Sequence, residues 1–156
     1  MHLRLLAIGD RQPAWVGDAF DSYAGRLPRE WRFKTQSIPT AKRSRNQPAS
    51  RAIDAEGQKL LANIGASEQL VLLDERGKQT TSRRLGNQLS TWLADGRDLV
   101  FVIGGPDGVS DDVRRRADIT WSLSQLTLPH GLARVLLVEQ LYRASSLLAG
   151  HPYHRE

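Results

Sequence analysis

The sequence contains no cysteine among its 156 residues. This absence excludes disulfide bonds and thiolate metal sites, and it fits a protein of the cytoplasm, where disulfides are rare. No apolar stretch approaches the roughly 20 residues that a membrane-spanning helix needs. The opening residues MHLR are not followed by the apolar core of a signal peptide. We therefore expect a cytoplasmic protein with no membrane partner.

Motifs for two common classes of cofactor are missing as well. There is no HExxH pair, and His130, His151 and His154 are too scattered for a zinc site, so we expect no metal. The GxGxxG fingerprint of dinucleotide-binding proteins is also unmatched. The glycine-rich segment at 104–108 contains Pro106, which lacks the backbone N–H that a pyrophosphate cradle needs. A ligand without phosphate suits this segment better.

The composition and charge indicate a basic globular protein. The formal net charge is +5, and hydrophobic residues make up 40% of the chain. This hydrophobic share is typical of globular proteins, and the length predicts one domain over residues 1–156. The excess of positive charge favours a polyanionic partner such as nucleic acid. A basic protein that is merely soluble explains the charge equally well.

Apolar segments of two kinds alternate along the chain. Short apolar runs such as LRLLAI, QLVLL and LVFVI predict buried strands, whereas apolar residues at helical spacing predict amphipathic helices. This alternation predicts an α/β fold with a mostly parallel sheet and helices on both of its faces. Strands are expected at 3–8, 32–38, 69–73 and 99–103, and helices at 13–27, 52–64, 82–95, from 111 onward and at 131–148.

Polar residues and glycines gather at three expected strand ends. Leu73 precedes a polar turn at 74–78, Gly104 and Gly105 close the most apolar strand, and a third loop spans 123–129. Ligands of parallel sheets bind at the carboxyl ends of strands. The backbone of the third loop, with its leucines as apolar walls, suits an adenine ring. A plain tight turn is the alternative explanation of the two glycines.

The C-terminal segment concentrates groups that suit a nucleobase. His151, Tyr153, His154 and Arg155 place hydrogen-bond donors, a phenol ring and a cation within a few residues. Such a segment is able to stack on a base and clamp it. A frayed terminus is the default expectation for a short polar end.

The expected loop at 40–50 is polar and basic. It contains Lys42, Arg43 and Arg45. Such a run is by default a solvated, charged loop. Near a binding site, however, these side chains would grip RNA phosphates.

The last expected helix is apolar almost all round. A helix of this kind must be buried on every side, and in a small domain a homodimer interface provides that burial. Glu139 lies within this helix and needs a cationic partner, for which Arg134 and Arg143 are the candidates.

Four motifs resemble one known family over the whole chain. VIGGPDG, WSLSQLTLPH, ARVLLVEQLYRA and the terminal HPYHRE are similar to the RlmH family of SPOUT-class methyltransferases. The resemblance implies transfer of a methyl group from S-adenosylmethionine to N3 of a pseudouridine in 23S ribosomal RNA of the assembled ribosome. It also implies a homodimer and a deep trefoil knot in the C-terminal part of the chain. Carried over by motif, the cofactor contacts are Leu73, Gly104, Gly105, Leu123, Ser124, Gln125, Leu126, Thr127, Leu128 and Pro129.

The chemistry of such a transfer suggests roles for the basic and terminal residues. The acceptor nitrogen carries a proton that must leave, and histidine has a suitable pKa for accepting it. His154 is the first candidate base, with Tyr153 stacking on the nucleobase and Arg155 holding a phosphate or stabilising an oxygen; His151 and water remain open as bases. The expected RNA contacts are Lys42, Arg43, Arg45, Arg134 and His151. A nucleotide-dependent enzyme of Rossmann type and a non-catalytic RNA-binding module are the two alternatives.

Overall fold

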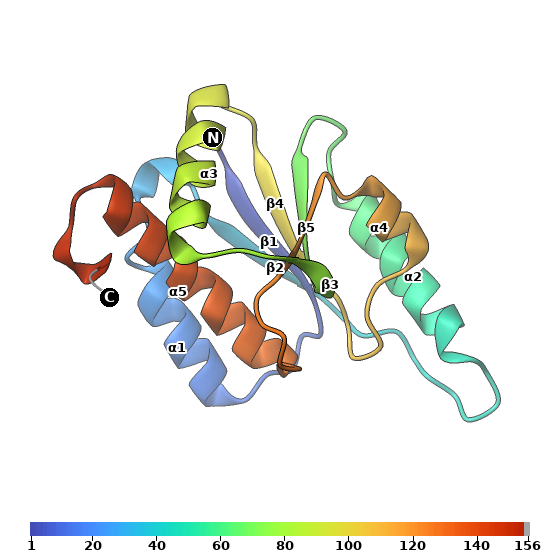
Figure 1. Ribbon diagram of the computed structural model, residues 1–156. Helices are drawn as coiled ribbons and strands as arrows, with labels where there is room; N and C mark the ends of the chain where they lie inside the picture. Colours follow the sequence, from blue (N-terminus) through green and yellow to red (C-terminus); the bar gives the residue numbers. More distant parts are fainter. Residues whose placement is uncertain (155–156) are drawn as a thin grey trace.

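The computed structural model describes residues 1–153 with their side chains and residue 154 by its backbone. One sheet of five strands forms its centre, in the order β2-β1-β4-β3-β5 (Figure 1). All the strand pairs in it are parallel, as the sequence predicted. The strands are β1 (Leu3–Ile8), β2 (Lys34–Ile38), β3 (Gln69–Gln79), β4 (Leu99–Ile103) and β5 (Ile119–Ser122).

Helices cover both faces of the sheet, which confirms the predicted layers. Helices α1, α3 and α5 lie on one face, and α2 and α4 lie on the other (Figure 1). Among the described residues, no helix combines the length and the apolar content needed to cross a bilayer. The helices are α1 (Ala14–Ala24), α2 (Ala49–Ala62), α3 (Ser82–Asp95), α4 (Asp111–Arg116) and α5 (His130–Leu148).

The burial of the central strand β4 on both faces explains why its sequence is continuously apolar. Leu99, Phe101 and Ile103 pack into the core beneath α1, α3 and α5. Val100 and Val102 point to the opposite face and join the core beneath α2 and α4. Burying one such side chain stabilises a fold by about 1.5–3 kcal/mol relative to leaving it exposed. The sheet is thus held by two apolar cores, one on each face.

Local signals place both ends of α3 and the start of α4 where the sequence predicted them, whereas α1 ends three residues early and α2 starts three residues early. The Thr81 hydroxyl accepts a hydrogen bond from the backbone N–H of Arg84 at 3.2 Å and caps α3. The Ser110 hydroxyl accepts one from the N–H of Val113 at 3.4 Å and caps α4. At the other end of α3, Gly96 adopts a left-handed conformation with φ of 69°, which glycine tolerates best.

The predicted polar turn at 74–78 is wrong, because this segment continues β3 to Gln79. Leu73 and Lys78 both pair with Trp121 of β5, so the intervening residues form an irregular stretch that bulges out of the ladder. Strand β5 itself was not among the expected strands. It is four residues long and lies at the sheet edge, so its apolar pattern is weak.

Gly77 lies against the backbone of β5. A Cβ atom at this position would lie 2.5 Å from the carbonyl carbon of Trp121 and 2.8 Å from the nitrogen of Ser122. Backbone atoms of a paired strand cannot move aside cheaply. The end of β3 therefore requires glycine for this close approach.

We expect Gly77→Ala to lower the free energy of unfolding by about 1–3 kcal/mol, as overpacking does elsewhere. Gly17→Ala is the control: a Cβ there would meet nothing within 4 Å, and alanine is the better helix former by about 1 kcal/mol. Urea unfolding measures both variants. Equal stabilities of the Gly77 variant and the wild type would contradict the close approach.

Candidate functional site

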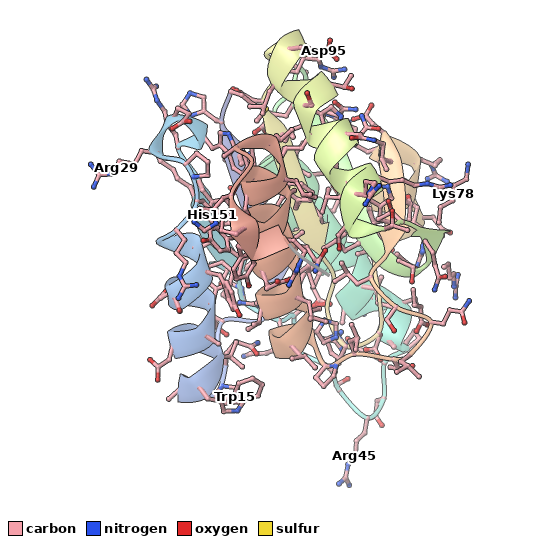
Figure 2. The ribbon with its side chains drawn as sticks, turned by 60° about the vertical axis from the view of Figure 1, so that its left-hand side comes forward. Trp15, Arg29, Arg45, Lys78, Asp95 and His151 are labelled. Carbon is pink, nitrogen blue, oxygen red and sulfur yellow. The ribbon has the colours of Figure 1, made fainter. Side chains whose placement is uncertain are left out.

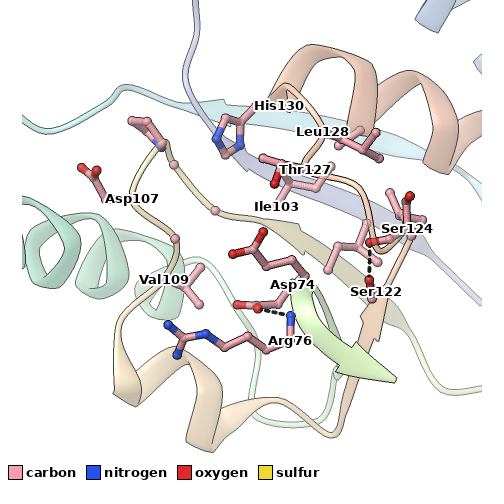
Figure 3. A pocket seen from close by; sticks show the side chains of 18 of the residues that line it. Asp74, Arg76, Ile103, Asp107, Val109, Ser122, Ser124, Thr127, Leu128 and His130 are labelled. Atoms are coloured by element: carbon pink, nitrogen blue, oxygen red, sulfur yellow. Dashed lines mark hydrogen bonds between the residues drawn. The ribbon is translucent and has the colours of Figure 1, made fainter. Parts of the chain in front are cut away.

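A pocket of about 350 Å³ opens at the carboxyl edge of the sheet (Figure 3). Three segments line it: the start of the irregular stretch of β3, the glycine loop at 104–108 between β4 and α4, and the loop that joins β5 to α5. These are the three segments that the sequence placed at strand ends. Their meeting follows from the parallel sheet, which brings all its carboxyl ends to one edge.

The pocket gathers the predicted cofactor residues except Gln125 and Pro129. Gln125 is exposed, and its side-chain nitrogen lies 3.5 Å from the side-chain oxygen of Gln79. Pro129 directly precedes α5. The predicted residues that do line the pocket are Leu73, Gly104, Gly105, Leu123, Ser124, Leu126, Thr127 and Leu128.

The glycine loop is a tight turn that is packed from within. The N–H of Gly108 donates to the carbonyl oxygen of Gly105 at 3.1 Å, and Gly108 has φ of 87°. A Cβ on Gly104 would lie 2.5 Å from Val109, and a Cβ on Gly105 would lie 3.0 Å from Ile8. The glycine segment is therefore a tight turn, as the alternative explanation held, and this turn also forms one wall of the pocket.

The loop after β5 is held by its own serines. The Ser122 hydroxyl donates to the carbonyl of Ser124 at 2.7 Å, and the Ser124 hydroxyl accepts from the N–H of Leu126 at 2.9 Å (Figure 3). Leu123 and Leu128 give this wall an apolar surface. Leu126 is 74% exposed, so it is a free apolar side chain at the pocket.

An ion pair that the sequence analysis did not assign also belongs to the pocket. Arg114 of α4 donates to the Asp74 carboxylate at 2.5 Å, and the N–H of Arg76 donates to the same carboxylate at 2.8 Å. Both Asp74 and Arg114 line the pocket. The position of Asp74 directly after a buried strand was a visible signal, whereas its partner lies 40 residues away.

His130 lies in the pocket wall at the start of α5. Burial lowers the pKa of its imidazole, and the charge of Arg134 lowers it further; a backbone hydrogen bond with Gly104 acts in the opposite direction. A lowered pKa keeps His130 neutral near pH 7. As a neutral ring it links the helix start to the glycine loop.

The predicted RNA contacts differ in their exposure. Lys42, Arg45 and His151 are exposed, and Figure 2 shows Arg45 projecting at the tip of its loop. Arg43 instead forms ion pairs with two carboxylates of the protein itself. Arg134 is only 7% exposed, and its guanidinium donates to the carbonyls of Ile8 and Gly9 and, at 3.1 Å, to the hydroxyl of Ser37.

The C-terminal segment folds back onto the C-terminal half of α5. The Tyr153 phenol donates a hydrogen bond to Glu139 at 3.1 Å, and the centre of its ring lies 4.5 Å from the centre of the Tyr142 ring. The Arg143 guanidinium lies 5.1 Å from the centre of the Tyr153 ring. Burial raises the pKa of the phenol, and its hydrogen bonds raise it further. Of the two candidate partners of Glu139, Arg143 forms the ion pair, at 2.7 Å. The predicted catalytic residue Arg155 and the His154 side chain lie outside the described residues.

The tail folds back along the C-terminal half of α5, whereas the pocket lies at the start of this helix. The helix has 19 residues, which corresponds to a length of about 28 Å. His130 at its first residue lines the pocket, and Tyr153 follows its last turn. Within one chain, Tyr153 does not line the pocket: its phenol stops at Glu139, about 14 Å along the helix axis from His130.

Comparison with known proteins places the whole chain in one family. The family model described as "Predicted SPOUT methyltransferase" matches residues 1–154. The protein named ribosomal RNA large subunit methyltransferase H of Thioalkalivibrio sulfidiphilus is 47% identical over 156 residues, and that of Laribacter hongkongensis is 49% identical over 156 residues, each match covering all of both chains. A crystal structure of the SpoU methyltransferase AviRb of Streptomyces viridochromogenes with AdoMet matches 92% of this chain and 58% of its own, at 16% identity and a TM-score of 0.47. The chain belongs to the SPOUT methyltransferase family.

Proposed function

We propose that the chain transfers a methyl group from S-adenosylmethionine to N3 of a pseudouridine in 23S ribosomal RNA of the assembled ribosome. The pocket formed by three segments at the carboxyl edge of the sheet carries this proposal, in a chain that matches rRNA large subunit methyltransferases over its full length. As a ribosomal enzyme it acts in the cytoplasm, and residues 1–156 form one domain.

The lining of the pocket suits S-adenosylmethionine. Its apolar walls, among them Ile103, Leu123 and Leu128, match an adenine ring, and the exposed backbone groups of the loops match the polar edge of that ring. The carboxylates of Asp74 and Asp107 also line the pocket, and each is already paired with an arginine of the protein. Pro106 in the glycine loop makes the pocket a poor cradle for a pyrophosphate, which favours this cofactor over a dinucleotide.

The main task of the chain in this reaction is positioning. Methyl transfer from a sulfonium is an in-line displacement, so the acceptor nitrogen must be held against the methyl carbon, and a misplacement of about 1 Å costs ~100-fold in rate. The proton on N3 passes to a base, for which His154, His151 and water are the candidates. Tyr153 stacks on the nucleobase, and Arg155, Lys42 and Arg45 bind phosphates of the RNA backbone.

A homodimer reconciles this chemistry with the position of the tail. Because Tyr153 packs along the C-terminal half of α5 and does not line the pocket of its own chain, the tail of one subunit completes the pocket of the other. The surface for such a dimer is available on α1 and α5. Trp15 is 57% exposed, and Leu132 and Leu136 are only partly buried. Not all of the apolar surface of α5 is free for such an interface, because Leu137 is in the core of the monomer at 1% exposure.

The deep trefoil knot remains part of the proposal. In Figure 1 the segment that follows β5 (orange) crosses the segment that joins β3 to α3 (green). The close approach of Gly77 to β5 brings these two segments together. Such a crossing is the arrangement that a knotted loop requires, and knots are rare in proteins.

The proposed reaction is tested by incubating the protein with labelled S-adenosylmethionine and assembled ribosomes, and then mapping the methylated nucleotide. We expect label on one pseudouridine of the 23S RNA. S-adenosylmethionine, and not NAD, should raise the melting temperature. Stabilisation by NAD would favour a Rossmann-type enzyme, and the absence of both shifts would favour an RNA-binding module.

We expect Gly105→Val to abolish the binding of S-adenosylmethionine. The branched side chain would meet Ile8 at 3.0 Å and Glu56 at 3.1 Å, and would push the turn into the pocket. Titration calorimetry measures the affinity, and circular dichroism confirms that the variant is folded. An affinity equal to that of the wild type would contradict the assignment of this loop to the cofactor site.

Removal of residues 153–156 should abolish ribosome methylation while S-adenosylmethionine still binds. The tail supplies the ring, the cation and the candidate base, whereas the cofactor loops lie at the far end of α5. A modest loss of stability is expected as well, because Tyr153 packs on Tyr142 and Glu139. Near-normal methylation by the truncated protein would show that the tail has no part in the acceptor site.

The dimer is tested with Leu136→Glu. An unpaired charge at a buried interface costs several kcal/mol, on the order of 3–5, so the variant should be monomeric or aggregated in light scattering. Thr91→Glu on the exposed side of α3 is the matched control and should leave the dimer intact. A well-folded dimer of the Leu136 variant would refute the proposed interface.

A further inference from the structure

Glu56 is a buried carboxylate to which the proposed reaction assigns no role. It lies on α2, and its side chain is only 3% exposed. A buried charge is tolerated when it is paired and hydrogen-bonded. Its cationic partner is Arg43, which donates to Glu56 at 2.9 Å; the N–H of Ala41 lies 3.5 Å from the second carboxylate oxygen.

Arg43 connects this carboxylate to the glycine loop. Its Nε donates to Asp107 at 2.6 Å, and Asp107 belongs to the turn that lines the pocket. A third bond, to the carbonyl of Ala41 at 3.0 Å, fixes the guanidinium on its own loop. The hydrogen bond to Asp107 is the main cause that raises the pKa of Arg43, so the pairing holds the charged form.

Glu56 also contacts the glycine loop directly. A Cβ on Gly105 would lie 3.1 Å from both oxygens of the Glu56 carboxylate. The turn is therefore bounded by Glu56 behind Gly105 and by Arg43 at Asp107. Two sides of one turn are held by a single ion pair, of which Glu56 is the buried member.

We propose that Glu56 and Arg43 are positioning residues that hold the glycine loop in the shape that binds the methyl donor. This inference rests on the proposed function and deepens it. It gives Arg43 a task inside the protein in place of the RNA contact expected from its basic loop. It also ties that basic loop, which carries Lys42 and Arg45, to the cofactor pocket.

A purely structural ion pair is the competing explanation, and Asp107 separates the two. Its side chain is 41% exposed, and ion pairs at such exposed positions contribute little to stability. Loss of the Asp107 carboxylate should therefore leave the free energy of unfolding nearly unchanged. If the carboxylate positions the loop, its loss should still weaken cofactor binding.

The experiment compares Glu56→Gln, Arg43→Ala and Asp107→Asn with the wild type by titration of S-adenosylmethionine. We expect Glu56→Gln and Arg43→Ala to bind about tenfold more weakly, the size of effect that a coupled network supports. The double variant Arg43→Ala/Asp107→Asn should bind no more weakly than Arg43→Ala alone, because both changes break one contact. Asp54→Asn, an exposed carboxylate on the same helix, is the matched control and should bind normally.

Hydrogen exchange gives a second readout that does not depend on the cofactor. The amide of Gly108, bonded to Gly105 within the turn, should exchange faster in Arg43→Ala and Asp107→Asn than in Asp54→Asn. The inference is overturned if Glu56→Gln and Asp107→Asn bind the cofactor within twofold of the wild type, or if the two changes in the double variant add. A wild-type protein that binds no S-adenosylmethionine would overturn the proposed function itself, and the inference with it.

Discussion

Burial of one parallel sheet on both faces is the constraint on which the rest of the structure depends. Every strand of such a sheet must return over a helix, so the helices divide between the faces and the carboxyl ends all meet at one edge. Strand β4 lies in the middle with no side chain exposed to solvent beyond 3%. Two glycines come directly after its last residue, because the chain must turn away without adding bulk to a crowded edge. The pocket is formed where the apolar interior ends.

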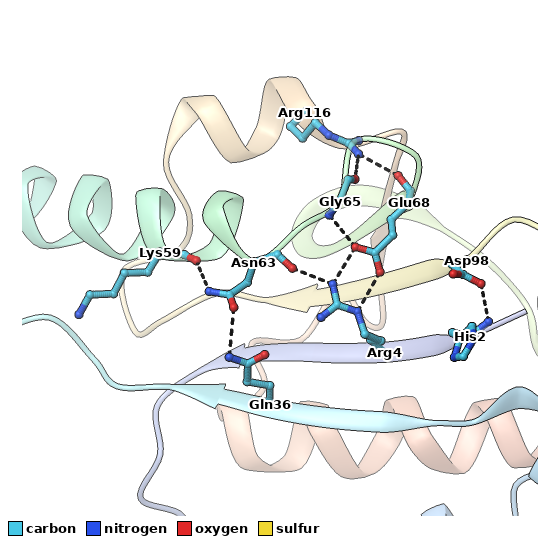
Figure 4. Close-up of polar contacts among 9 residues, drawn as sticks. All are labelled: His2, Arg4, Gln36, Lys59, Asn63, Gly65, Glu68, Asp98 and Arg116. Carbon is cyan, nitrogen blue, oxygen red and sulfur yellow. Dashed lines mark hydrogen bonds and ion pairs between the residues drawn. The ribbon is translucent and has the colours of Figure 1, made fainter.

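The amino edge of the sheet is held by polar groups. At the opposite edge, Arg4, Glu68 and Arg116 form a network with the carbonyls of Asn63 and Gly65 (Figure 4). That network ties α2, α4 and the start of β3 together, and the proposed reaction uses none of it. At the amino edge, side chains and carbonyls thus bond to one another, whereas the carboxyl edge surrounds a pocket lined by apolar groups, by loop backbone and by the Asp74–Arg114 ion pair.

Local patterns made most of the fold and most of the pocket predictable. The runs of β1 and β4, the caps Thr81 and Ser110 and the glycines after β4 all act within a few residues, so their meaning is visible in the sequence. Contacts between distant segments were not visible. Arg43 meets a carboxylate 64 residues away, and a cation in a polar loop looks solvated until the fold supplies that partner. The continuation of β3 was missed for the same reason, because its pairing with β5 depends on a shifted register.

The buried guanidinium of Arg134 has a consequence for the order in which the protein is made. It joins the last helix to the carbonyl of Ile8, which is 126 residues nearer the start of the chain. At usual rates of translation these two groups are synthesised roughly 6–25 s apart. The edge of β1 that pairs with β4 stays unpaired through most of that interval, since β4 is also made late, whereas the other edge pairs with β2, which follows β1 closely in the sequence. The cation that closes this contact is therefore supplied only after most of the chain has been made.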